Sequence, residues 1–136
     1  MIAVDTGVLV DFLFDGPTAE ASTLALRDAA ECGRLAICDV VLAELCSRGH
    51  GESLRSALAG LGIQFLPTAE SAAVRAGEMF QRYRERGRPE GRTIVDFLIG
   101  AHALLQCQGL ITLDAAFYRD YFKGLRLIVP GADARL

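Results

Sequence analysis

Acidic residues in this sequence recur where short apolar segments end, or inside apolar segments that are typical of helices. Asp5, Asp39 and Asp114 each follow an apolar run that is typical of a buried strand. Glu44 and Asp96 lie within apolar helical segments. A carboxylate among apolar side chains is costly to bury, so each of these acids needs a helix cap, a basic partner or a metal ion.

Helix capping is the structural explanation for most of these acids. Asp is a favoured N-cap, and we interpret Asp39 as the cap of the helix that follows it. Asp114 could cap its own following helix in the same way. Asp96 lies three residues after Thr93, which resembles a capping box with Asp in place of Glu. Glu44 has no such explanation, because it lies in mid-helix without an obvious cation nearby.

Taken together, four of the acids indicate a shared site. Residues at the carboxyl ends of parallel strands and in the first turns of the following helices meet at one edge of a sheet, where ligands bind. Crowded carboxylates repel one another unless a cation neutralises them, and an all-oxygen cluster suits Mg²⁺ or Mn²⁺. The chemistry that follows is metal-assisted phosphodiester hydrolysis. The four acids are Asp5, Glu44, Asp96 and Asp114.

The elements that would position these acids alternate between strand and helix. Predicted strands cover residues 2–4, 35–38, 63–66, 110–113 and 125–129. Predicted helices cover residues 6–14, 19–32, 40–47, 53–61, 68 or 71 to about 86, 93–108 and 115–122. This alternation with short connections predicts an α/β fold with a parallel sheet of about five strands, helices on both faces, and one domain over residues 1–136.

Composition narrows the class of protein further. The chain has 136 residues, of which 51% are hydrophobic, so disorder is excluded and one ordinary domain is expected. No apolar run is long enough for a membrane span and no signal peptide is recognisable, so we expect a cytoplasmic protein. The cysteines lack C-x-x-C spacing and are predicted to be reduced core residues. They are Cys32, Cys38, Cys46 and Cys107.

Arginines cluster in the segment that precedes Asp96, although the net charge of the whole chain is −3. A locally positive segment could bind the phosphates of a polyanion such as RNA. The alternative is a solvated helix face with ion pairs between residues three or four apart. The candidate RNA-binding residues are Arg82, Arg84, Arg86, Arg88 and Arg92.

Four segments carry the acids in this order along the chain: Val4-Asp5-Thr6, Val41-Leu42-Ala43-Glu44-Leu45, Asp96-Phe97-Leu98-Ile99-Gly100-Ala101, and Thr112-Leu113-Asp114-Ala115-Ala116-Phe117. In this order and at these separations, they resemble the motifs of PIN-domain ribonucleases, especially the VapC-type toxins of VapBC toxin–antitoxin systems. The resemblance covers essentially the whole chain. It implies a PIN-like three-layer α/β/α fold, a homodimer, a cognate VapB-type antitoxin and metal-dependent cleavage of RNA that leaves 3′-hydroxyl and 5′-phosphate ends.

The resemblance also assigns roles to the acids. We expect Asp5, Asp96 and Asp114 to hold Mg²⁺, with Mn²⁺ able to substitute, and Glu44 to orient a water or complete a second metal site. Hydroxyl groups next to these acids are candidates for holding the carboxylates in position. They belong to Thr6 and Thr112.

Two positions depart from the pattern of the family. Gly7 stands where the opening motif commonly has Asn, and Leu113 stands where a basic or polar residue is frequent. Neither departure removes an acid. Gly7 leaves out only the hydrogen bonds that an Asn side chain would supply around the site.

An antitoxin would need a surface on this chain. We expect an apolar groove beside the acids, together with an antitoxin Arg or Lys that enters the acidic crevice and pairs with Asp5 or Asp96. The residues expected around the groove are Leu9, Phe12, Leu13, Leu42 and Leu45.

Other classes of protein fit the sequence less well. Asp5-Thr6-Gly7 matches the triplet of aspartic proteases, but those enzymes are all-β and this chain is rich in predicted helices. Aspartyl-phosphate phosphatases usually carry a second Asp where this chain has Gly7. A non-catalytic PIN-like module for RNA binding or protein interaction is the main alternative, and such a module would be expected to lack one of the acids.

Overall fold

The computed structural model describes residues 1–88 and 91–132, and these residues form a parallel five-stranded sheet with the order β3-β2-β1-β4-β5. The strands are β1 (Ile2–Val4), β2 (Leu35–Ile37), β3 (Gln64–Phe65), β4 (Leu110–Ile111) and β5 (Leu127–Ile128). The helices are α1 (Thr6–Phe14), α2 (Ala19–Cys32), α3 (Asp39–Cys46), α4 (Gly51–Gly60), α5 (Glu70–Glu85), α6 (Ile94–Gln106) and α7 (Ala115–Tyr121).

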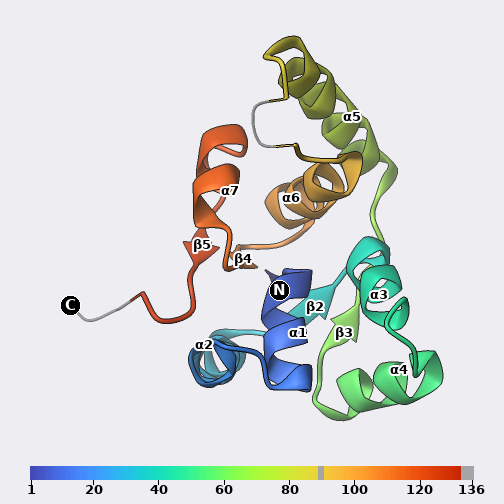
Figure 1. Cartoon of the computed structure of the whole chain (residues 1–136), viewed down its shortest axis with the longest axis vertical. Helices are drawn as coiled ribbons and strands as arrows, with labels where there is room; N and C mark the ends of the chain where they lie inside the picture. The colour runs from blue at the N-terminus through green and yellow to red at the C-terminus, as the bar shows by residue number, and fades with distance from the viewer. Residues whose placement is uncertain (89–90, 133–136) are drawn as a thin grey trace.

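The sheet lies between layers of helices. Helices α1 and α2 pack on one side of it, and α5 and α6 pack on the other (Figure 1). Helices α3 and α4 lie beside β2 and β3, and α7 contacts β5. This arrangement confirms the predicted three-layer α/β/α fold. Within the described ranges, no helix has both the length and the apolar character needed to cross a membrane.

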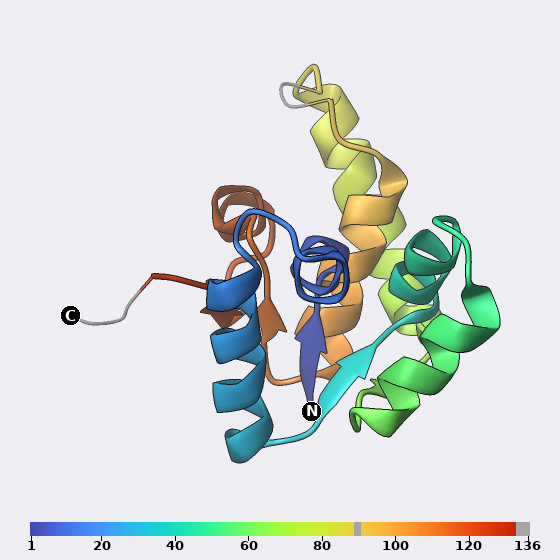
Figure 2. The ribbon, with the colours of Figure 1, turned by 60° about the horizontal axis from the view of Figure 1, so that its bottom comes forward.

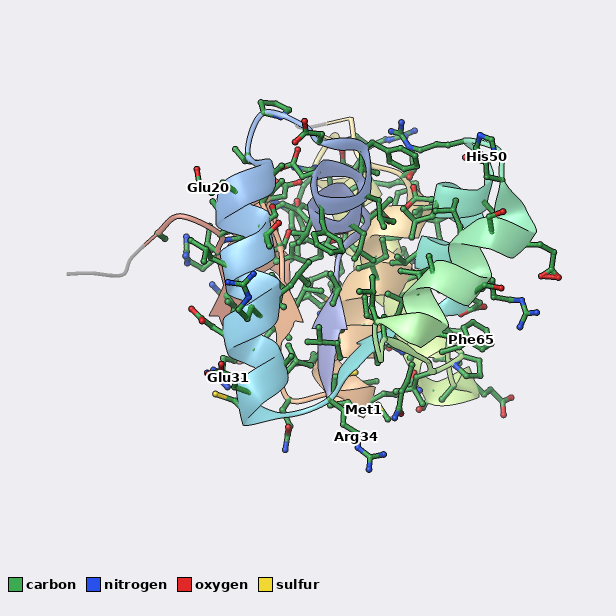
Figure 3. The ribbon with its side chains drawn as sticks, turned by 90° about the horizontal axis from the view of Figure 1, so that it is seen from below. Met1, Glu20, Glu31, Arg34, His50 and Phe65 are labelled. Carbon is green, nitrogen blue, oxygen red and sulfur yellow. The ribbon has the colours of Figure 1, made fainter. Side chains whose placement is uncertain are left out.

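Strand β1 is the centre of the sheet. Its three residues are buried, and it lies between β2 and β4 (Figure 2). Ala3 is in register with Ala36 of β2 and with Leu110 of β4. Met1 and Arg34 mark the edge of the sheet where the strands begin (Figure 3). The opposite, carboxyl edge of β1 leads directly into α1, so Asp5 lies at that edge.

Aromatic rings join α5, α6 and α7 into one part of the core. Phe97 of α6 lies at its centre, and its ring centroid is 5.2 Å from that of Phe117 and 5.3 Å from that of Tyr83. A Cβ atom added at Gly100 would lie 2.4 Å from Cε2 of Phe122. Glycine at this position therefore allows the end of α7 to pack directly against α6.

One capping prediction is wrong. Asp39 is the first residue of α3, and Cys38 occupies the N-cap position. The Asp39 carboxylate instead accepts the backbone N–H of Thr68 at 3.0 Å and its hydroxyl at 2.6 Å. Strands β2 and β3 are neighbours, so the residues that follow them lie close together, and a tertiary contact replaces the local cap.

Several predicted boundaries also shift. Strands β2, β3, β4 and β5 are each shorter than expected, and α4 begins at Gly51 rather than at residue 53. Thr93 is the N-cap of α6 rather than its first residue. The order and type of the elements nevertheless agree with the prediction throughout.

Two expectations about exposure are wrong. Leu9 and Leu45 are fully buried in the core, so they do not line an apolar groove, whereas Phe12, Leu13 and Leu42 are half-buried. Spacing alone does not determine which residues of an apolar helix face inward. The cysteines are free as expected, but one of them, Cys32, is exposed.

Candidate active site at the carboxyl edge of the sheet

Asp5 lies where the central strand ends. Its Oδ1 accepts the backbone N–H of Thr6 at 2.8 Å, so it caps α1, and its Oδ2 accepts the hydroxyl of Thr112 at 2.7 Å. Burial raises the pKa of Asp5 to about 6, although these two hydrogen bonds oppose the rise. The neighbouring carboxylates of Asp96 and Asp114 contribute to the same rise. Asp5 therefore caps a helix and also faces other acids.

Thr6 links two of the acids. Its backbone N–H donates to Asp5, and its hydroxyl donates to Oε1 of Glu44 at 2.5 Å. Glu44 is half-buried in α3, so this bond gives a polar partner to the acid that had no local explanation in the sequence.

Thr112 has a similar position on the other side of Asp5. Its side chain is fully buried just after β4, where its hydroxyl donates to Asp5 and its Oγ1 accepts the backbone N–H of Asp114 at 3.0 Å. The end of β4 thus positions two acids at once. Both threonines that were expected to hold carboxylates make such contacts.

Asp96 and Asp114 meet at the guanidinium of Arg92. Asp96 lies in the first turn of α6, where Oδ2 accepts the backbone N–H of Thr93 at 3.1 Å and Oδ1 lies 3.9 Å from Nη1 of Arg92. The same nitrogen donates to Oδ2 of Asp114. Asp114 precedes α7 but makes no capping bond with its side chain, so its principal partner is Arg92.

These contacts bring all four predicted acids to one edge of the sheet. Each acid shares a partner or an electrostatic interaction with the next, although they come from four separate segments of the chain. Their roles in catalysis and metal binding stay predictions. The connected side chains are Glu44, Thr6, Asp5, Thr112, Asp114, Arg92 and Asp96.

The donor set fits a hard divalent cation, because carboxylate oxygens are the ligands that Mg²⁺ and Mn²⁺ prefer. Within residues 1–88 and 91–132, however, no group of three or more Asp, Glu, His and Cys side chains is arranged to hold a metal ion. The guanidinium of Arg92 lies against Asp114 and near Asp96, two of the three predicted ligands. The chemistry of the donors therefore suits a cation, and a basic side chain of the protein itself lies among them.

The other arginines of the basic segment lie outside this site, and three of them lie over aromatic rings. The guanidinium carbons of Arg84 and Arg88 are 5.2 and 5.8 Å from the ring centroid of Phe80, and that of Arg86 is 4.9 Å from the ring of Tyr121. All three arginines are exposed at the surface.

Ion pairing does not dominate the basic segment. Arg86 forms a pair with Asp120 of α7 at 3.5 Å, and Arg82 contacts the sulfur of Met79. In the part of the chain that the structure describes, no ion pair joins two residues of α5. The described residues of α5 therefore do not form the alternative, a helix face with ion pairs between its own residues. RNA binding by these arginines stays a prediction.

Tyr118 is a residue that the sequence did not single out. It is buried in α7, four positions after Asp114, and burial strongly raises the pKa of its hydroxyl, with Asp5, Asp96 and Asp114 adding to the effect. Its hydroxyl therefore stays neutral beside the acids. Only the spacing of four residues from Asp114 could have indicated its place.

The two departures from the family pattern lie next to each other. A Cβ atom added at Gly7 would be 3.9 Å from Cδ1 of Leu113, which is an ordinary contact distance. Gly7 and Leu113 are both exposed, so together they form a small, apolar part of the surface beside the acids.

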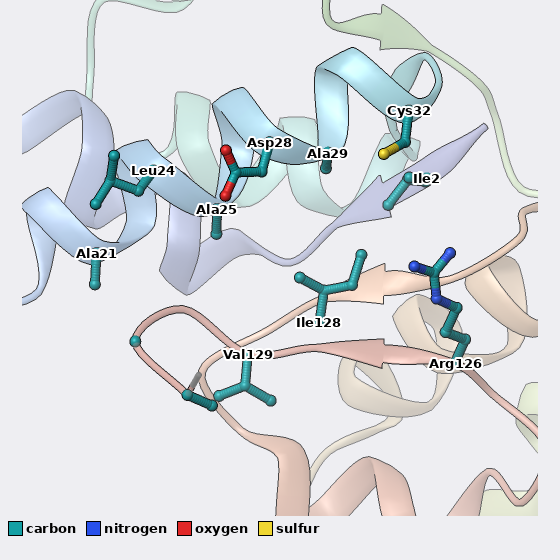
Figure 4. A pocket seen from close by; sticks show the side chains of 12 residues that line it. Ile2, Ala21, Leu24, Ala25, Asp28, Ala29, Cys32, Arg126, Ile128 and Val129 are labelled. Atoms are coloured by element: carbon teal, nitrogen blue, oxygen red, sulfur yellow. The ribbon is translucent and has the colours of Figure 1, made fainter. Parts of the chain in front are cut away.

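A separate cavity of about 400 Å³ lies between α2 and β5 (Figure 4). Ile2, Leu24, Ile128 and Val129 contribute its apolar wall, and none of the four acids lines it. This cavity is therefore distinct from the acidic edge.

A parallel sheet with clustered acids at its carboxyl edge defines a class of α/β proteins that bind ligands at that edge. Over residues 2–123, the sequence matches the model of the PIN domain. The chain therefore belongs to the PIN-domain family.

Solved structures of similar fold cover nearly the whole chain. VapBC2 from Rickettsia felis, bound to a DNA fragment from its promoter, has a chain with a TM-score of 0.74 and 23% identity over 95% of this chain and 98% of its own. VapBC-1 from nontypeable Haemophilus influenzae has a TM-score of 0.71 and 21% identity over 95% and 98%. The sarcin–ricin loop cleaving toxin VapC20 from Mycobacterium tuberculosis has a TM-score of 0.60 and 18% identity over 93% and 99%. No curated protein sequence matches this chain significantly.

Proposed function

We infer that this chain is a metal-dependent endoribonuclease and the toxin of a type II toxin–antitoxin pair. The observation that carries the nuclease proposal is the connected set of acids at the carboxyl edge of the sheet, in a chain of the PIN-domain family. The toxin proposal draws support from chains of similar fold that come from VapBC complexes and match nearly full length.

Asp5, Asp96 and Asp114 would hold Mg²⁺ or Mn²⁺. When bound, such a cation supplies positive charge that polarises the scissile phosphate and makes a water more acidic. Burial and the neighbouring carboxylates disfavour the charged form of Asp5. A bound cation would neutralise the repulsion between these carboxylates, so their proximity favours cation binding.

The remaining polar groups position the acids. Thr6 holds Glu44 toward Asp5, which suits Glu44 for orienting the attacking water or for completing a second metal site. Thr112 fixes one oxygen of Asp5 and the backbone that carries Asp114. Hydrogen bonds of this kind orient the carboxylates that would bind the metal and tune their basicity.

RNA would be held by charge next to this site. Arg84, Arg86 and Arg88 present exposed guanidinium groups, with Arg84 in the last turn of α5 beside Arg82 and the other two just after the helix. We expect their contacts to be made with phosphates rather than with bases, because phosphate contacts depend on positive charge and not on base sequence.

The partner proposed for this chain is a cognate VapB-type antitoxin, and the assembly proposed for the free toxin is a homodimer in the cytoplasm. Phe12, Leu13 and Leu42 retain partial exposure on α1 and α3, so an apolar segment of the antitoxin would contact these residues. A basic side chain of the antitoxin would then reach the acids nearby.

Cleavage of RNA by purified protein tests the nuclease proposal. Wild type should cut RNA with Mg²⁺ or Mn²⁺ and stop when EDTA is added. The variants Asp5→Asn, Glu44→Gln, Asp96→Asn and Asp114→Asn should each abolish or strongly reduce the cleavage, while circular dichroism shows folded protein. Folded wild type that binds RNA without cutting it would instead support the non-catalytic module.

Expression in cells tests the toxin proposal separately. This chain alone should arrest growth, and the gene that neighbours it should restore growth. Replacing Phe12 with Glu should loosen the complex and spare cleavage. Harmless expression of soluble protein, with a neighbour that neither binds it nor changes cleavage, would rule out the toxin proposal and leave the nuclease proposal standing.

A further inference from the structure

Arg92 is the basic residue that lies among the site acids. Its Nη1 donates to Oδ2 of Asp114 and lies 3.9 Å from Oδ1 of Asp96. The two ion pairs place a positive charge between carboxylates that would otherwise repel each other. The guanidinium of an arginine carries a permanent positive charge in a protein, so Arg92 is a counter-ion at every relevant pH.

The structure fixes Arg92 from several directions. Its guanidinium carbon lies 4.3 Å from the ring centroid of Phe117, and its backbone N–H donates to the hydroxyl of Tyr83 at 2.5 Å. Its backbone carbonyl accepts Nη2 of Arg88 at 3.1 Å. The side chain is also mostly sheltered from solvent, in contrast to Arg84, Arg86 and Arg88.

This arrangement conflicts with simultaneous metal binding at the same oxygens. A guanidinium and a divalent cation would bind the same carboxylate oxygens of Asp114, so they compete for them. Two positive groups within a few ångströms also repel each other. Apart from Arg92, no Lys or Arg in the described ranges forms an ion pair with any of the four site acids.

We propose that Arg92 is an internal counter-ion of the acidic site, which a divalent cation must displace from Asp114 and Asp96 before the site is complete. The proposal deepens the metal-dependent function inferred above and rests on it. The same arginine that balances the carboxylates in the metal-free protein thus sets the concentration of metal at which the protein becomes loaded.

Direct measurement of metal binding tests this role without relying on cleavage. Calorimetric titration of the purified full chain with Mn²⁺ should give a dissociation constant at least about tenfold lower for Arg92→Gln than for wild type, because one charge-assisted contact no longer competes. Arg92→Lys should lie between the two, since a lysine keeps the charge but lacks the planar fork.

Arg55→Gln is the matched control. Arg55 is paired with Glu52 at 3.0 Å on α4, so this variant also removes one positive charge and one ion pair, but away from the acids. Its affinity for Mn²⁺ should stay within about twofold of wild type. The comparison separates a local competition from a general change in net charge.

Thermal unfolding gives a second readout. Without metal, Arg92→Gln should melt below both wild type and Arg55→Gln, because the acids lose their counter-ion. Saturating Mn²⁺ should remove that difference, since the bound cation stabilises the folded state in its place. If Arg92→Gln does not fold without metal, Arg92→Lys carries the test, and it should still bind Mn²⁺ more tightly than wild type.

The outcomes separate this proposal from the function on which it rests. Wild type that binds Mn²⁺ and cuts RNA, with the same or weaker binding in the Arg92 variants, overturns the counter-ion role alone. Absence of Mn²⁺ binding in wild type and in every variant overturns both the counter-ion role and the metal-dependent function.

Discussion

The hydroxyl of Thr6 donates to Oε1 of Glu44 at 2.5 Å, while the backbone N–H of the same residue donates to Asp5. One residue in the first turn of α1 therefore sets the relative position of two acids from different segments. A side chain without a hydroxyl at this position would leave Glu44 free to rotate away from the site.

Replacing Thr6 with Val tests this relationship. Val has nearly the same shape but cannot donate to Glu44, so RNA cleavage should fall about 10- to 100-fold with little change in the fold. Thr6→Ser keeps the hydroxyl and should retain most of the activity. Rates measured on one RNA at saturating Mg²⁺ provide the comparison, and equal rates for Val and Ser would contradict the role of the hydrogen bond.

The raised pKa of Asp5 predicts how the stability of the metal-free protein depends on pH. The pKa is about 6 in the folded state and 3.8 ordinarily, so the folded protein holds this proton more tightly. Above about pH 6, Asp5 is charged in both states, and its burial lowers the free energy of unfolding by the full amount. As the pH falls toward 4, Asp5 takes up a proton in the folded protein and this destabilisation disappears. The full effect is at most about 3 kcal/mol.

Urea unfolding of wild type and Asp5→Asn at several pH values measures that contribution. The stability of wild type relative to the variant should rise between pH 7 and pH 4, because the variant has no charge to lose at this position. Both proteins share every other titrating group, which makes the difference specific to Asp5. Parallel curves would show that burial of Asp5 has no energetic effect.

The exposed arginines predict that the affinity for RNA depends on salt concentration. Replacing Arg84, Arg86 and Arg88 together with Gln should weaken binding to all RNA sequences alike and reduce the slope of log affinity against log salt by about two. A triple variant at Arg27, Arg34 and Arg126 loses the same charge from other exposed positions. Equal effects of the two triple variants would indicate general attraction rather than a local site.

Gly100 provides a test of the packing that positions α7. Alanine at this position places a methyl group within 2.4 Å of Phe122, which should destabilise the protein by about 1–3 kcal/mol. Gly77 on α5 has no atom within 4 Å of an added Cβ, so Gly77→Ala should instead stabilise it by about 0.5–1 kcal/mol. Denaturant unfolding of both variants distinguishes the two helix glycines.

The sequence predicted the order of the elements because its strands are short, apolar and separated by helices. It also singled out Glu44, since an acid in the middle of an apolar helix has no local explanation. It did not predict the contact of Asp39 with Thr68, because local capping and tertiary contacts compete for the same carboxylate.

The position of Arg92 among the acids could not be predicted from the sequence. Its neighbours in the sequence are exposed arginines, so its charge suggested a contact with RNA. Its direction is set by Tyr83 of α5 and by Asp114 and Phe117 at the start of α7, which lie in two other segments of the chain. The burial of Leu9 and Leu45 has the same kind of cause, because three-dimensional packing determines which apolar side chains face the core.

The hydrogen bond from Thr112 to Asp5 joins residues that are 107 positions apart. During synthesis on a ribosome, Asp5 and Glu44 emerge long before β4 can pair with β1. A nascent chain that lacks residues 110–114 therefore has only one of the two neighbours of its central strand and lacks one of the four acids. The proposed nuclease would thus be inert throughout most of its own translation, which leaves time for a partner to meet it before it can cut.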